Sequence, residues 1–142
     1  MVKIIDNMSL KKHCKNKKRK KSRYNRGTYV SKIAGECKYR SGWEQKYMEY
    51  LDADKNVTTW SYEKLIIEYV SNNKTKKIRK YYPDFQVEYA NGEKVVIEIK
   101  PSRKLKQLNV LKKIKAAIAW CIENDMIYKI LTEVELKKLG VI

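Results

Sequence analysis

Two acidic residues and one lysine lie on stretches whose side chains alternate as they do in β-strands. Asp84 lies in the alternating stretch 82–89, and Glu98 and Lys100 share one face of the stretch 94–100. The apolar residues of the second stretch point to the opposite face. An apolar strand has little reason to place an acid and a lysine side by side unless that face is an edge or a site.

These residue types predict a site for a divalent cation. Asp84 and Glu98 supply hard oxygen ligands, and the carbonyl of Ile99 lies between Glu98 and Lys100. This donor set suits Mg²⁺ or Mn²⁺, which bind few carboxylates and keep several waters. Such an ion polarises a phosphate and acidifies a water for in-line attack, and Lys100 would orient that water. Gln86 follows Asp84 on the same face and is a candidate for a supporting hydrogen bond.

The loop between the two stretches decides whether this site forms. Asn91-Gly92 favours a two-residue turn, which would direct Asp84 away from Glu98. A three-residue loop over 90–92, with Gly92 left-handed, instead sets Asp84 directly opposite Glu98. We predict the three-residue loop because only it builds the site. The alternative is a plain hairpin with solvated charges.

The charge of the chain is large and uneven. The 142 residues carry 33 Lys and Arg against 16 Asp and Glu, a net charge of +17. Residues 1–40 hold 14 of the basic residues and 2 of the acids, so we expect a basic, partly flexible arm there and a domain at 41–142. Such an arm is expected to bind a polyanion, and nucleic acid is the first candidate. The candidate DNA-binding residues are Lys17, Lys18, Arg19, Lys20, Lys21, Arg23, Arg26, Arg40 and Arg79.

Other classes of protein are disfavoured by composition. The three cysteines are odd in number and widely spaced, which predicts no disulfide framework and fits a reducing compartment. We expect no membrane span, because no apolar run is long enough. The only histidine, His13, lies in the arm, so a Ser-His-Asp site is not expected.

The remaining pattern predicts an α/β core with a mixed sheet in the order α-β-β-β-α-β. A helix should run over 42–51, opened by a capping box between Ser41 and Glu44. A second capping box at Thr132 opens the last helix. The expected strands are 57–62, 64–70, 77–82, 84–89, 94–100 and 127–131.

A long helix should follow Pro101, with Ser102 as its N-cap. Its buried side is predicted from the apolar residues at helical spacing. Those residues are Leu105, Leu108, Leu111, Ile118 and Ile122, with Val110, Ile114, Ala117 and Trp120 widening the face.

The spelling Pro83-Asp84 followed by Glu98-Ile99-Lys100 resembles the PD-(D/E)xK nuclease superfamily. Over about residues 23–135 the chain is similar to the head completion nucleases of tailed phages and to transposon-end-cleaving (TnsA-like) endonuclease subunits. The similarity rests on Arg23-Tyr24-Asn25-Arg26-Gly27, Tyr39-Arg40-Ser41-x-Trp43-Glu44, Trp60-x-x-Glu63, Arg79-x-Tyr81-x-Pro83-Asp84-Phe85 and Ile97-Glu98-Ile99-Lys100-Pro101.

The resemblance implies a restriction-endonuclease-like αβββαβ core and a catalytic set of Glu44, Asp84, Glu98 and Lys100. Glu44 would add a metal ligand, or it serves only as the helix cap. Glu63 matches a recurrent acid of these families, whose role is catalytic or structural.

The expected activity is metal-dependent hydrolysis of DNA phosphodiester bonds, in phage head completion or a related phage or mobile-element pathway. A site- or structure-directed nicking endonuclease is one alternative, and a non-catalytic basic DNA-binding or virion structural protein is another. Expected partners are DNA, a second copy of the chain on DNA, and phage head or portal components. The expected location is the host or bacterial cytoplasm, with association with the virion as the alternative.

Overall fold

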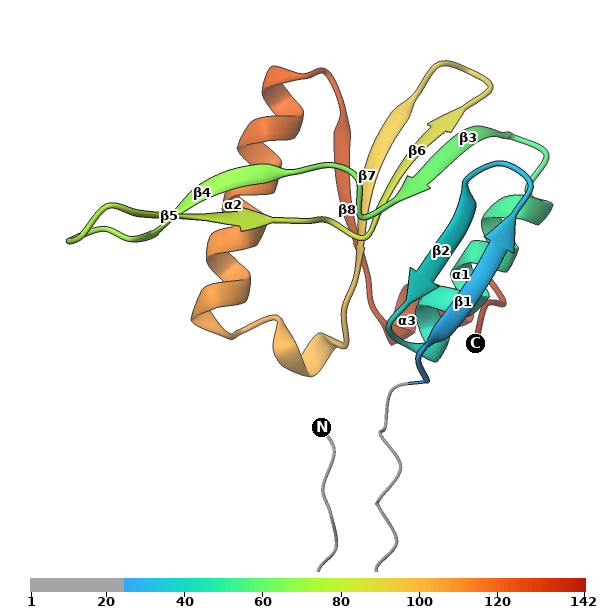
Figure 1. The fold of residues 1–142 in the computed structure, drawn as a ribbon, viewed down its shortest axis with the longest axis horizontal. Coiled ribbons are helices and arrows are strands. Elements are labelled where there is room, and N and C mark those ends of the chain that lie inside the picture. The colour runs from blue at the N-terminus through green and yellow to red at the C-terminus, as the bar shows by residue number, and fades with distance from the viewer. Residues whose placement is uncertain (1–24) are drawn as a thin grey trace, which may run out of the picture.

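A computed structural model describes residues 25–142 and shows an α/β fold built around one mixed sheet (Figure 1). The elements in chain order are β1 (Gly27–Ser31), β2 (Gly35–Tyr39), α1 (Gly42–Ala53), β3 (Val57–Tyr62), β4 (Ile67–Asn72), β5 (Lys77–Tyr81), β6 (Phe85–Tyr89), β7 (Lys94–Ile99), a short 3-10 helix (Ser102–Lys104), α2 (Leu108–Glu123), β8 (Ile127–Leu131) and α3 (Glu133–Lys138).

The central sheet has the strand order β3-β6-β7-β8. β3 and β7 each pair antiparallel with β6, and β8 pairs parallel with β7. The parallel pair needs a long crossover, which α2 supplies. The elements α1, β3, β6, β7, α2 and β8 therefore form the predicted restriction-endonuclease-like core. The β4–β5 hairpin is inserted between β3 and β6 and lies across α2 (Figure 1).

Residues 27–39, which fall within the predicted basic arm, form a second hairpin, β1–β2. The carboxylate of Asp52 in α1 holds this hairpin. It accepts hydrogen bonds from Tyr29 Oη at 2.6 Å, Ser31 Oγ at 2.7 Å and Trp60 Nε1 at 2.9 Å. Burial and the bond to Asp52 raise the pKa of Tyr29 to about 12. One acid thus joins the hairpin, α1 and β3.

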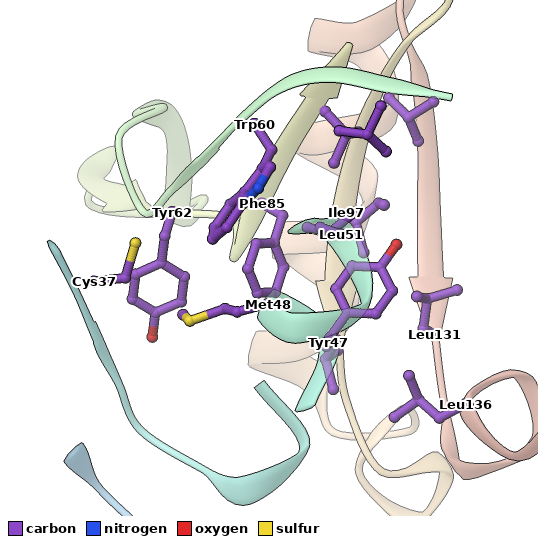
Figure 2. Packing of buried hydrophobic residues seen from close by; sticks show 14 residues of the cluster. Cys37, Tyr47, Met48, Leu51, Trp60, Tyr62, Phe85, Ile97, Leu131 and Leu136 are labelled. Carbon is purple, nitrogen blue, oxygen red and sulfur yellow. The ribbon is translucent and has the colours of Figure 1, made fainter. Parts of the chain in front are cut away.

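The main core lies between α1 and the sheet and is rich in aromatic rings (Figure 2). Phe85, at the start of β6, is 1% exposed. Its ring centroid lies 5.2 Å from that of Tyr47, 5.8 Å from that of Trp60 and 5.4 Å from that of Tyr62. Edge and tilted contacts of this kind stabilise a core beyond the area that they bury. They fix the strand that begins directly after Asp84.

The structure corrects the prediction for the long helix in two ways. α2 begins at Leu108, and Ser102 instead opens the short 3-10 helix. Part of the side predicted to be buried is exposed, with Leu108 at 68% and Ile122 at 72%, whereas Val110 and Ala117 of that side are buried as predicted. The buried residues are Val110, Ala117 and Cys121. Both sides of the helix are apolar, and the smaller side chains allow the closer approach to β4 and β8.

The prediction of a capping box at Thr132 is confirmed. Thr132 caps α3 through a reciprocal capping box, and Gly140 takes the left-handed conformation just beyond that helix. Cys37 and Cys121 are both buried free thiols. Among residues 25–142, the helices are too short or too polar to cross a membrane.

Candidate active site

The β6–β7 hairpin has the register that the site requires. Phe85 pairs with Ile97 and Glu88 with Lys94, so the next pair beyond Phe85 is Asp84 opposite Glu98. The amide of Tyr89 donates to the carbonyl of Glu93 at 2.9 Å, which closes a three-residue loop. Gly92 has φ +92, the left-handed conformation predicted for it. The prediction that Asp84 and Glu98 share one side of the sheet is confirmed.

Asp84 is a buried carboxylate, 7% exposed, in the segment between β5 and β6. Its Oδ2 atom accepts a hydrogen bond from the amide of Ile99 at 2.8 Å. Burial raises the pKa of Asp84 well above its ordinary value, and the charges of Glu98 and Glu44 raise it further. The Ile99 amide and Lys100 act in the opposite direction. The balance favours a proton or a cation on this carboxylate.

Glu98 is 8% exposed and is held from both sides. Its Oε1 atom accepts a hydrogen bond from Tyr81 Oη at 2.6 Å, and its Oε2 atom lies 3.4 Å from Lys100 Nζ. Burial raises the pKa of Glu98, while the bonds from Tyr81 and Lys100 lower it. Tyr81 Oη also lies 3.0 Å from Tyr128 Oη, so two tyrosines fix the position of the acid.

Glu44 lies in the first turn of α1 and is buried. Ser41 Oγ accepts a hydrogen bond from the Glu44 amide at 3.2 Å, as predicted. The reciprocal bond differs, because Glu44 Oε1 accepts from the amide of Arg40 at 2.8 Å and from Tyr62 Oη at 2.7 Å. Glu44 is therefore both a structural acid at the start of α1 and one of the charges that raise the pKa of Asp84.

The two less certain site candidates are the acid Glu63 and the amide Gln86. Glu63 pairs with Arg40 at 3.2 Å, and burial raises the pKa of Glu63 while Arg40 lowers it. Its backbone is left-handed, with φ 54, at the bend after β3. The side-chain amide of Gln86, the candidate for a supporting hydrogen bond, donates to Met126 Sδ at 3.8 Å.

The donor set fits a hard divalent cation that keeps part of its water shell. Asp84 and Glu98 are opposed, buried carboxylates whose mutual repulsion a cation would remove. In the part of the chain that the structure describes, no three His, Cys, Asp or Glu side chains cluster tightly enough to form a metal cage. Mg²⁺ needs no such cage, because it binds one or two carboxylates together with water and phosphate. Ile99 lines the same cavity as Glu44 and Lys100, so its carbonyl remains a predicted ligand.

That cavity has a volume of about 580 Å³ and lies beside the β7 end of the hairpin. Its basic lining residues are Arg26, Arg40, Lys100, Arg103 and Lys104. The structure thus places Arg26 and Arg40 at the candidate active site, whereas Arg79 lines a different groove. Lys17–Lys21 and Arg23 lie outside the described residues.

Several site residues were not found by sequence reasoning. Arg103 and Lys104 follow Pro101, where the expected helix start concealed their position in the cavity. Tyr81 binds Glu98 from β5, and Tyr128 of β8 contacts the Tyr81 hydroxyl, an arrangement that no local pattern reveals. Glu133 accepts a hydrogen bond from the Ser102 amide at 3.0 Å and another from Ser102 Oγ. Glu133 therefore anchors the segment that follows Lys100.

Comparisons with known proteins agree with this geometry. The head completion nuclease of Enterobacteria phage T4 is 36% identical over 77 residues, which are 52% of this chain and 51% of that protein. The chain thus spans about half the length of the curated relative that it matches. The family described as "TnsA-like endonuclease N terminal" matches residues 54–133, more than half of the chain, and this range includes Asp84, Glu98 and Lys100. The chain belongs to the TnsA-like endonuclease N-terminal family.

Proposed function

We propose that this protein is a metal-dependent DNA endonuclease that hydrolyses phosphodiester bonds. The observation that carries the proposal is the place of Asp84, one residue before β6 and opposite Glu98 of β7, with Lys100 Nζ 3.4 Å from Glu98. Two buried acids of like charge are costly side by side unless a cation joins them. The basic cavity next to them suits a phosphate backbone.

The residues divide the work of the reaction. Asp84 and Glu98 would hold Mg²⁺ or Mn²⁺, which when bound polarises the scissile phosphate and acidifies a water. Lys100 is held beside Glu98, where its ammonium group orients the attacking water and neutralises charge on the phosphate. Arg26, Arg40 and Arg103 line the cavity and supply the guanidinium groups that grip neighbouring phosphates.

Glu44 has a more indirect place in this scheme. Both of its side-chain hydrogen-bond partners, the Arg40 amide and Tyr62 Oη, donate to its Oε1 atom. Oε2 therefore remains the atom that a metal-bound water would contact. We assign Glu44 to the hydration shell of the ion, while it also fixes Arg40 at the cavity.

The pathway is inferred from the relatives. We place the protein in the processing of phage DNA during head completion, in the host cytoplasm, with DNA as its substrate. Cutting both strands would require a second copy of the chain on the same DNA. Head and portal proteins are the further partners that this pathway implies.

The test is the conversion of supercoiled DNA to nicked and linear forms in Mg²⁺ or Mn²⁺. Glu98→Gln and Lys100→Met should lower the cleavage rate by about a hundredfold or more, because each removes a group next to the reacting phosphate. Glu88→Gln and Lys94→Met are matched controls, since these residues pair with each other further along the same two strands. Equal cleavage by all variants would refute the proposed site. Binding of DNA without cleavage by the native chain would favour a non-catalytic DNA-binding protein.

A further inference from the structure

A second basic groove lies between the β4–β5 hairpin and α2, and it shares no lining residue with the active-site cavity. Its volume is about 680 Å³. The hairpin contributes Lys77 and Arg79, and the helix contributes Lys112 and Lys113. None of the nine described residues that line it is acidic, so four positive charges face one concavity without compensation.

The alternation of β5 explains why two of these charges face the helix. Tyr81 is buried in a small cluster with Ile67 of β4 and Ala117 of α2. Arg79 and Lys77 lie two and four residues before Tyr81 on the same strand, and therefore share its face. Lys80 lies on the opposite face of the same strand.

The walls of the groove are joined before any ligand arrives. Lys112 Nζ donates a hydrogen bond to the carbonyl of Ser71 at 2.6 Å, which ties α2 to the end of β4. The hairpin also lies across the helix and contacts it through β4 (Figure 1). A preformed site loses less conformational freedom when it binds. Asn72 and Asn109 add neutral hydrogen-bonding groups to the lining.

The groove adjoins the candidate active site through one aromatic ring. Lys113 Nζ lies 5.8 Å from the ring centroid of Tyr81, and Tyr81 Oη donates to Glu98. Lys113, Tyr81, Glu98 and Lys100 also line a small cavity between the two sites. A backbone bound in the groove would therefore pass close to the catalytic acids.

We propose that this groove binds the phosphate backbone of DNA to one side of the cut, with Lys77 and Arg79 as direct phosphate contacts. The choice of DNA as the ligand rests on the function proposed above. Phosphate contacts of this kind position a duplex without reading its sequence. The groove would thus set how much DNA beyond the cut the enzyme must hold.

Salt dependence of DNA binding tests this assignment. Binding of a labelled duplex to the full chain is measured by fluorescence anisotropy in EDTA, between 50 and 200 mM salt. Each lost phosphate contact lowers the slope of log affinity against log salt by about 0.9, so Lys77→Gln/Arg79→Gln should lower it by nearly 2. Over this fourfold range of salt, the double variant should therefore lose about tenfold less affinity than the native chain.

The matched control is Lys74→Gln/Lys80→Gln. These lysines lie on the same hairpin but do not line the groove, and the change in charge is the same. The control should keep the native slope to within about 0.5, allowing for long-range screening. Equal slopes for the two double variants would overturn the groove and show only a general effect of net charge. Lys112 is left unchanged, because its loss would also release the hairpin.

A series of duplexes shortened from one end provides an independent readout. The affinity of the native protein should fall in a step at the duplex length that no longer reaches the groove. Lys77→Gln/Arg79→Gln should show little or no step. A step of equal size in both proteins would overturn the proposal. Neither measurement requires cleavage, so a native chain that binds in this manner but never cuts DNA would refute the nuclease and leave the groove intact.

Discussion

Asp84→Asn should stabilise the folded protein in the absence of metal while abolishing cleavage. Asp84 is buried, faces Glu98 across the hairpin, and has its pKa raised by burial and by two neighbouring acids. Asparagine has nearly the same shape and can still accept the hydrogen bond from the Ile99 amide, which lies 2.8 Å from Asp84 Oδ2. The substitution therefore removes the repulsion and retains the contact.

The magnitude follows from the charges. Two carboxylates on opposed strand positions about 5 Å apart repel by about 3 kcal/mol at an effective dielectric constant of about 20. Lys100 and the Ile99 amide favour the ionised acid and offset part of this repulsion. We expect a net stabilisation of about 1–3 kcal/mol at neutral pH, or about 4 °C in Tm for each kcal/mol.

The effect should depend on pH and on metal in a defined direction. Because folding raises the pKa of Asp84, the folded state binds the proton more tightly and the penalty grows as pH rises. The advantage of Asp84→Asn should therefore shrink as pH falls and Asp84 becomes protonated. Mg²⁺ or Mn²⁺ at a hundredfold excess over Kd should raise the free energy of unfolding of the native chain by about 2.7 kcal/mol, and its Tm accordingly. The same metal should leave the stability of Asp84→Asn largely unchanged.

The assay is thermal unfolding followed by circular dichroism, in EDTA and with a series of metal concentrations. Glu93→Gln, at an exposed position in the same hairpin, makes the same change in charge and should shift stability by less than about 0.5 kcal/mol. If Asp84→Asn destabilises the protein in EDTA, or if both proteins gain equally from metal, Asp84 and Glu98 do not share a cation.

Three further predictions follow from other contacts. Tyr81→Phe removes the donor to Glu98 Oε1 and should slow cleavage by about tenfold with little change in DNA affinity; a wild-type rate would mean that the tyrosine does not position the acid. Asp52→Ala leaves three donors from the β1–β2 hairpin and β3 without their acceptor and should lower the free energy of unfolding, measured in denaturant, by about 2–4 kcal/mol. An unchanged free energy of unfolding would show that Asp52 does not hold the hairpin. The bonds from Ser102 lower the pKa of Glu133 to about 2 from its ordinary 4.5, so the stability that ionised Glu133 adds should be present above about pH 4.5 and be lost as pH falls toward 2. The stability difference between native chain and Glu133→Gln should close over that window, and a constant difference would contradict the contact with Ser102.

The part of the site carried by one hairpin could be predicted from sequence. The period of two in each strand gives the face of Glu98 and Lys100, and the left-handed Gly92 fits a three-residue loop that sets the register. Both signals are local, so they survive without knowledge of the tertiary fold. The family resemblance added Glu44, which lies outside the hairpin.

The remaining features depend on contacts between distant segments. Tyr81 reaches Glu98 only because the β4–β5 hairpin folds across α2. α2 is apolar on two sides, so hydropathy alone could not show that Cys121, rather than Leu108 and Ile122, would be buried. The capping pattern at α1 correctly predicted the hydrogen bond from the Glu44 amide to Ser41, but the Glu44 carboxylate accepts a hydrogen bond from Tyr62 of β3.

The most direct measurement of the central claim is a crystal structure of the native chain with Mn²⁺, located by anomalous scattering. The ion should be bonded to one carboxylate oxygen of Asp84 and one of Glu98, with Lys100 Nζ within reach of a metal-bound water. The same crystals of Asp84→Asn should show the ion lost or weakened. An Mn²⁺ ion bound at other residues in a chain that still cleaves DNA, with the Asp84 and Glu98 carboxylates bonded to none, would contradict the account.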